Sequence, residues 1–267
     1  MSNPSDSPVT LHGFTAVPAS ASALLTRTPE YPAPTASAPP LSVFDTPIPN
    51  TPLAKRIQAY ALEHLPAPTY NHSSRVYHFG LAIKRWRFPS WSFSDETYFL
   101  ACMLHDIGTT EENLRKTRLS FEFYGGMLAM EVLRKAGETE GGSKVLVAPV
   151  EQAESVVEAI IRHQDLCEVG KITAVGQLLQ LATIFDNTGT YEDLVHPSTI
   201  DNVNVAFPRL KWADCFAATI RQENSLKPWA HTTALGEDDW PKLFVWQRRR
   251  NVNTSKGLVA EVCMSTR

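Results

Sequence analysis

The most apolar stretch of the chain is followed at once by two polar residues. Residues 98–104, YFLACML, are apolar or nearly so at every position, and His105 and Asp106 come next, before Gly108 ends the run. A helix that is hydrophobic on all sides is a buried helix. The pattern therefore predicts a central helix that brings an imidazole and a carboxylate into the core, where neither is tolerated without a partner.

Other segments show helical periods of apolar positions or helix boundary signals. Thr51 and Pro52 have the form of a helix start, and the apolar positions that follow keep to one face as far as about residue 65. Ser94, followed by two acidic residues, gives the central helix a capped start. Prolines 66 and 68 are expected to separate the first helix from the second. The remaining expected helices span about residues 71–86, 120–135, 149–164, 172–187, 212–224 and, as a last segment, 238–249.

The fold class expected from these segments is all-α. No segment shows a convincing alternation of period two with hairpin turns. With 267 residues the chain is long enough to bury a substantial core. We therefore predict a helical bundle that forms one domain over residues 51–249.

The two ends of the chain are expected to lie outside this bundle. Residues 1–50 contain ten of the 19 prolines and no sustained period, which predicts a proline-rich N-terminal arm. The arm either flexes as a tail or is held across the domain by its scattered apolar residues, and we expect it to pack. Residues 250–267 are mostly polar and are expected to form a C-terminal tail.

Charge and cysteine content restrict the function classes. The 25 basic and 28 acidic residues are nearly balanced, and no basic run suggests nucleic acid as a partner. No leader segment and no apolar run of ~20 residues is recognisable, so neither a membrane span nor secretion is expected. The cysteines are scattered without metal-knuckle or disulfide spacing, which indicates a reducing compartment, and we expect a cytoplasmic protein. They are Cys102, Cys167, Cys215 and Cys263.

His72 is a candidate partner for the central doublet. It shares one helical stripe with the residues three, four, seven and eleven positions further on. These four residues are Arg75 and the apolar Val76, Phe79 and Ile83. His78 lies six positions on, about 240° round a helix, so both histidines cannot reach one metal from a regular helix. We select His72 and expect His78 to pack or hydrogen-bond elsewhere.

His163 and Asp186 each end an apolar stripe on a further helix. Taken alone, each is simply a capping group or a satisfied core polar group. Together with His72 and the doublet, however, four separate helices each bring metal-competent side chains to the core. Coincidence explains that poorly, and a shared cation is the simpler hypothesis.

These motifs carry a resemblance to known enzymes. The order of His72, the His105–Asp106 doublet and Asp186 resembles the metal-dependent HD domain superfamily. The segments APTYNHSSRVYHFG, ACMLHDIGTT, SFEFYGG, IIRHQD and LATIFDN are similar to the fungal cyanamide hydratases, which are zinc-dependent lyases of that fold, and the likeness extends over about residues 14–249. It implies His72, His105, Asp106 and Asp186 as zinc ligands, with Asn71, His163 and Thr183 beside the substrate.

The resemblance also implies a reaction, the hydration of the nitrile group of cyanamide to give urea. Two imidazoles and two carboxylates suit zinc, and also iron or manganese. Such a cation lowers the pKa of a bound water toward ~7, and the resulting hydroxide is the expected nucleophile. His163 is the expected proton donor to the nitrile nitrogen, and Asn71 and Thr183 are expected to orient the substrate. Family likeness further implies a homo-oligomer.

Two other functions fit the same order of residues. An HD-superfamily phosphohydrolase acting on a nucleotide or other phosphate monoester needs cations around the phosphoryl group. Arg75 shares the face of His72 and can serve, whereas the basic residues at 115, 116 and 118 are more simply a solvated run. A catalytically silent HD domain that only binds a ligand or partner is the third reading. The complete ligand set and the available proton donor favour the enzyme.

Overall fold

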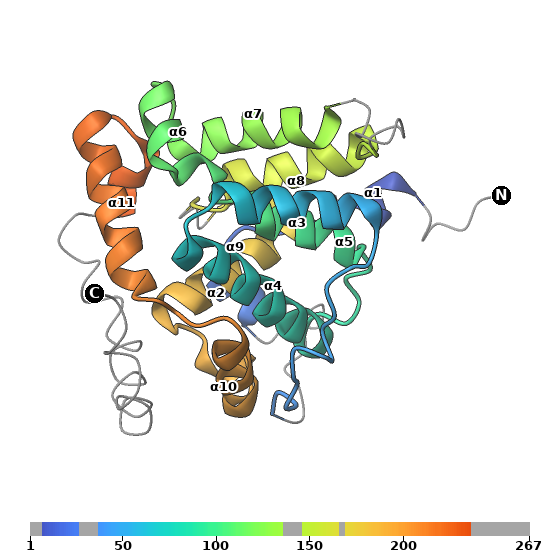
Figure 1. The fold of residues 1–267 in the computed structure, drawn as a ribbon. Coiled ribbons are helices and arrows are strands. Elements are labelled where there is room, and N and C mark those ends of the chain that lie inside the picture. Colours follow the sequence, from blue (N-terminus) through green and yellow to red (C-terminus); the bar gives the residue numbers. More distant parts are fainter. Residues whose placement is uncertain (1–6, 27–36, 136–145, 166–168, 236–267) are drawn as a thin grey trace, which may run out of the picture.

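Most of the residues that the structure describes are helical, and the predicted fold class is confirmed (Figure 1). The computed structural model describes residues 7–26, 37–135, 146–165 and 169–235. The helices are α1 (Pro8–Leu11), α2 (Ala21–Leu25), α3 (Pro52–His64), α4 (Ala67–Arg87), α5 (Asp95–Leu104), α6 (Glu111–Lys116), α7 (Phe121–Arg134), α8 (Val150–Arg162), α9 (Ala174–Thr188), α10 (Pro197–Ala206) and α11 (Trp212–Leu226). Short 3₁₀ turns are η2 (Ile107–Thr109), η3 (Glu192–Leu194) and η4 (His231–Leu235).

The centre of the bundle is built from α4, α5 and α9. The long helix α4 packs on both of the others, and α8 packs on α5, α7 and α9. In Figure 1, α7 and α8 lie side by side along the top of the bundle, and α10 lies at the opposite end. Every residue of α5 from Thr97 to Leu104 is buried, as its apolar sequence predicts. The residues that follow α5 therefore enter the middle of the core.

Two helix boundaries differ from the prediction by more than two residues, the start of α4 and the end of α5. α4 begins at Ala67 rather than near residue 71, because Pro68 stands in its first turn, where a missing N–H costs nothing. α5 ends at Leu104 rather than at Gly108, and His105 and Asp106 form a turn before η2. Gly108 lies where a Cβ would collide with the carbonyl oxygen of Phe121, so the glycine permits the start of α7 to approach.

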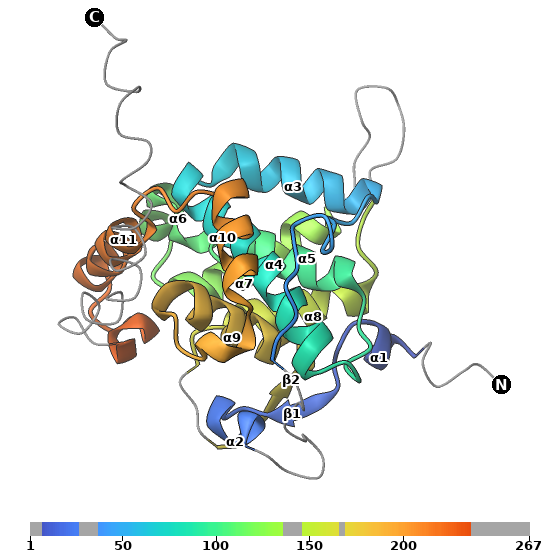
Figure 2. The ribbon, with the colours of Figure 1, turned by 90° about the horizontal axis from the view of Figure 1, so that it is seen from below.

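The described parts of the N-terminal arm lie against the helices. β1 (Ala16–Pro18) pairs antiparallel with β2 (Lys171–Thr173), with Val17 opposite Ile172, and this small sheet lies beside α2 in Figure 2. Sequence reasoning missed it because three residues are too few to show a period. The domain limits stay a prediction, and the expected helix 238–249 and tail 250–267 lie outside the described residues.

His78 contacts the arm rather than the doublet, which confirms its predicted role. Its Nδ1 lies 2.7 Å from Oγ1 of Thr46, and its ring stacks on Phe207. The imidazole therefore joins the arm to α4.

Among the described helices, none is both long enough and apolar enough to cross a membrane.

Candidate active site

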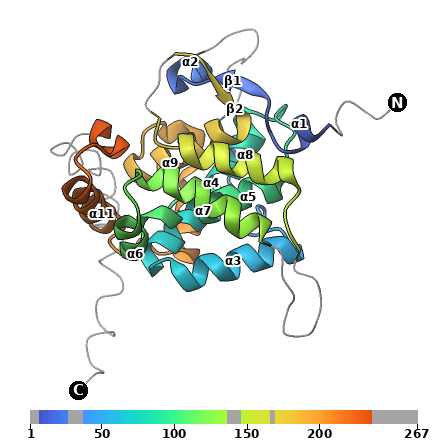
Figure 3. The ribbon, with the colours of Figure 1, turned by 90° about the horizontal axis from the view of Figure 1, so that it is seen from above.

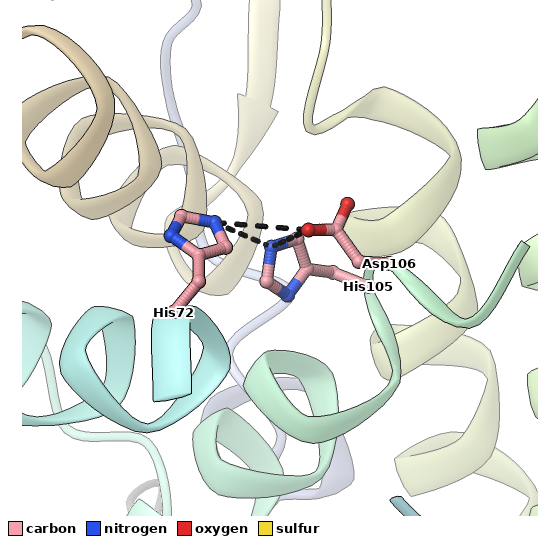
Figure 4. Close-up of side chains that lie close together, drawn as sticks. All are labelled: His72, His105 and Asp106. Atoms are coloured by element: carbon pink, nitrogen blue, oxygen red, sulfur yellow. Dashed lines mark hydrogen bonds and ion pairs between the residues drawn. The ribbon is translucent and has the colours of Figure 1, made fainter. Parts of the chain in front are cut away.

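His72, His105 and Asp106 point at one another in the centre of the bundle (Figure 4). The Nε2 atoms of the two histidines are 3.2 Å apart, and Oδ2 of Asp106 lies 3.3 Å from Nε2 of His105 and 3.7 Å from Nε2 of His72. All three side chains are at most 1% exposed. Within the described part of the chain, this is the group of three that offers close ligand atoms for a metal.

The other ring nitrogen of each histidine is already committed. Nδ1 of His72 is 2.6 Å from Oδ2 of Asp186, and Nδ1 of His105 is 2.7 Å from the carbonyl oxygen of Cys102. Both partners are acceptors, so each Nδ1 carries the proton and each neutral ring has its lone pair on Nε2. Hydrogen bonds of this kind fix the tautomer and the ring plane of metal-binding histidines.

His163 approaches the same point from the end of α8. Its Nδ1 donates to the carbonyl of Ile160 at 2.6 Å, and its Nε2 lies 3.8 Å from Oδ1 of Asp106. Nε2 of His163, both carboxylate oxygens of Asp106 and Oγ1 of Thr183 are buried and have no hydrogen-bond partner. Buried polar atoms are nearly always satisfied. The lone pairs on Nε2 of His72 and His105 and the unpaired carboxylate of Asp106 meet at one point, and together they fit a divalent cation that takes nitrogen and oxygen donors.

Asp186 contacts the other side of His72. Its Oδ1 accepts from Nε of Arg75 and Nη1 of Arg209, both at 2.9 Å, and its Oδ2 accepts from Nη2 of Arg75 at 2.9 Å as well as from His72. The structure therefore brings three of the four predicted ligands together and places the fourth against Nδ1 of His72. That Asp186 is a direct ligand stays a prediction.

Charge and burial act in opposite directions on the two aspartates. Burial would raise the pKa of Asp186, but Arg209 and Arg75 hold this pKa well below its ordinary value. Burial raises the pKa of Asp106, which His72 and His163 only partly oppose. Asp186 is thus ionised beside His72 through its two arginine partners, whereas a negative charge on the buried Asp106 would need a bound cation to stabilise it.

The two remaining predicted site residues lie on the helices that carry His72 and Asp186. Asn71 precedes His72 on α4, and its amide nitrogen donates to the carbonyl of Pro208 at 2.8 Å. Thr183 lies one turn before Asp186 on α9 and is buried. Their roles beside a substrate stay predictions.

Two residues of the site environment were missed by sequence reasoning. The ring of Trp212 stacks on that of His72, with centroids 4.2 Å apart and an interplanar angle of 13°. Arg209 pairs with Asp186 from the segment that leads into α11. Arg209 and its neighbours show no periodic pattern, so the sequence offers no signal that the guanidinium turns inward.

Replacing Arg209 with methionine is expected to destabilise the fold. The change keeps the aliphatic bulk but leaves Asp186 with one guanidinium, and losing a hydrogen bond to a buried charge costs about 2 kcal/mol of unfolding free energy. Guanidinium denaturation measures this loss. Arg115→Met is the control, because its pair with Glu111 is exposed and should change stability by less than about 0.5 kcal/mol. Equal stability of the two variants would contradict the role of Arg209.

The buried histidines predict a loss of stability in acid. Burial lowers the pKa of His72, His78, His105 and His163 to about 4. In the unfolded chain these groups titrate near about 6.5, so between pH ~6.5 and ~4 the unfolded state binds more protons than the folded state. The unfolding free energy of the metal-free protein should therefore decrease as the pH is lowered through this window, by on the order of 1 kcal/mol per pH unit for each group. Equal denaturation midpoints at pH 7 and pH 5 would refute this.

Fold and site together define an all-α protein with a buried cluster suited to a metal ion. Two proteins of Saccharomyces cerevisiae, Cyanamide hydratase DDI2 and Cyanamide hydratase DDI3, are each 46% identical to the chain over 192 residues. The match covers 72% of this chain and 81% of each relative. The chain belongs to the cyanamide hydratase family. A scan against models of protein families finds no match, and membership of the HD superfamily stays a prediction.

Proposed function

We propose that this protein adds water to the nitrile group of cyanamide and releases urea. The observation that carries the proposal is the buried point at which Nε2 of His72, of His105 and of His163 meets the unpaired carboxylate of Asp106. The two yeast relatives named cyanamide hydratase support it. The reaction is balanced by one water for each cyanamide.

We propose that His72, His105 and Asp106 hold one divalent cation, with Asp186 predicted as a further ligand. Zinc is the proposed metal, because nitrogen and carboxylate donors suit it, although iron and manganese share this preference. When bound, such a cation acts as a Lewis acid and makes water nucleophilic near neutral pH. The hydrogen bonds from Nδ1 of both histidines hold their ligand lone pairs in place.

His163 is the proposed proton-transfer residue. Because Nδ1 donates to the carbonyl of Ile160, Nε2 is the atom free to accept a proton. As the water oxygen bonds to the nitrile carbon, Nε2 takes a proton from that oxygen and one carbon–nitrogen π pair moves to the terminal nitrogen. Nε2 then gives its proton to this nitrogen, so His163 serves first as base and then as the donor predicted from the sequence. Transfer of the second proton from oxygen to nitrogen converts the isourea to urea.

Thr183 and Asn71 are proposed to orient the substrate. The hydroxyl of Thr183 is buried without a hydrogen-bond partner and therefore has capacity left for a polar ligand. Asn71 adjoins His72, and its carboxamide carries an acceptor besides the nitrogen that donates to Pro208. A small molecule matches a site whose polar side chains, apart from the half-buried Asn71, are buried.

The phosphohydrolase alternative lacks its expected cation. Arg75, the candidate phosphate partner, donates through Nε and Nη2 to Asp186 and through Nη1 to the carbonyls of Phe207 and Pro208. Its guanidinium is thus committed within the fold, and it is not available to a phosphoryl group.

A substrate panel tests the proposal. Purified protein should release urea from cyanamide and no phosphate from nucleotides or small phosphate monoesters. Phosphate release without urea would replace the proposal with the alternative, and the absence of both would favour a silent binding domain. A homo-oligomeric, cytoplasmic protein remains our expectation, to be checked by light scattering and by cell fractionation.

A further inference from the structure

A tryptophan from the peripheral helix α11 covers the ligand histidine of the site. Resting on the proposed function, we propose that Trp212 is a specificity-determining residue that restricts the substrate to a nitrile as small as cyanamide. Trp212 is 2% exposed, and its indole lies flat on the ring of His72. Its Nε1 donates to Oδ1 of Asn187 at 2.8 Å, so stacking and a hydrogen bond together fix the plane of the indole.

The cover extends from His72 to His163. Trp212 belongs to a small hydrophobic cluster that is separate from the main core, and the ring of Phe216, one turn further along α11, lies 5.1 Å from it. Phe121, in the same cluster, meets the ring of His163 edge-on at 5.6 Å. The other members are Leu114 and Ile220. One apolar layer therefore adjoins both the proposed ligand and the proposed proton-transfer residue.

Helix α11 packs on α4, the helix that carries His72, and on α6. Figures 1 and 3 show α11 at the edge of the bundle, beside α6. The helix therefore closes one side of the site from outside the central helices.

Both ends of α11 are fastened to the bundle. Before its first turn, Arg209 pairs with Asp186. Near its last turn, Oε1 of Glu223 accepts from the backbone N–H of Phe121 at 2.7 Å, and Nζ of Lys227 donates to the carbonyl of Leu119 at 2.7 Å. The indole is therefore held in place by a rigid element, as a size limit requires.

Truncating the indole tests the size limit. Trp212→Ala opens a cavity beside His72, and one methylene in an apolar pocket is worth roughly tenfold to 200-fold in selectivity. The kcat/KM for dimethylcyanamide, relative to that for cyanamide, should therefore rise at least about tenfold. Trp212→Phe should move the ratio less, in the same direction. Trp229→Ala, at a tryptophan that is 60% exposed, should leave the ratio unchanged.

A purely structural role would lower both kcat/KM values together, and an unchanged ratio in folded Trp212→Ala would overturn the inference. If that variant does not fold, Trp212→Phe decides by the same ratio. If the wild type releases no urea, the proposed function is wrong, but the position of Trp212 over the site can still be tested. The measurement is then the access of a chelator to bound zinc. Bound zinc should then pass to a chelator about tenfold faster in Trp212→Ala than in the wild type or Trp229→Ala. Equal transfer rates would contradict the inference that Trp212 covers the site.

Discussion

Replacing Asp106 with asparagine is expected to abolish both metal binding and urea formation. The two carboxylate oxygens are buried without hydrogen-bond partners, and one lies within 3.7 Å of both proposed histidine ligands. The amide keeps the shape but removes the negative charge that a divalent cation requires. We expect metal affinity to fall by more than about 100-fold and kcat/KM by at least about 10³-fold, since a Lewis acid contributes several kcal/mol.

Elemental analysis and a urea-release assay on the same preparation measure both effects. Asp193→Asn is the matched control, because Asp193 is an exposed carboxylate on η3. It should keep the metal content and the turnover of the wild type. Asp106→Asn with wild-type metal content would show that the carboxylate is not a ligand.

Replacing His163 with alanine is expected to separate chemistry from metal binding. Nε2 of His163 is 3.8 Å from Asp106 and has no hydrogen-bond partner, and the imidazole is not in the group of close ligand atoms. The variant should retain its metal. Its kcat should fall by about 10²- to 10⁴-fold, the usual contribution of a positioned acid or base.

The control is His64→Ala, at an exposed histidine whose Nδ1 bonds to the carbonyl of Tyr60. It should be indistinguishable from the wild type in both metal content and turnover. If His163→Ala lost as much metal as Asp106→Asn, His163 would be a ligand, and the proton-transfer role would be wrong.

Local capping signals predicted the starts of α3 and α5. Thr51 caps α3 and Ser94 caps α5, each through its hydroxyl, because a cap depends only on the next few residues. The helix ends were less predictable. The end of α5 depends on how closely Gly108 lies to Phe121, a contact with another helix, which no local pattern encodes.

The convergence of His72, His105 and Asp106 was also predictable, because His72 begins a largely apolar stripe and the doublet directly follows an apolar run. The orientation of Asp186 was not. Its carboxylate turns to Nδ1 of His72 because guanidinium groups hold it there, and one of these, on Arg209, comes from a segment without helical period. Trp212 was expected only as a helix start, since stacking between residues so far apart in the chain depends on where α11 lies.

Metal content and urea formation, measured on one purified preparation before and after chelation, test the central claim most directly. We predict about one divalent cation per chain, held by His72, His105 and Asp106. We also predict that urea release from cyanamide disappears with the metal and returns when zinc is restored. Undiminished urea release from metal-free protein would contradict the account.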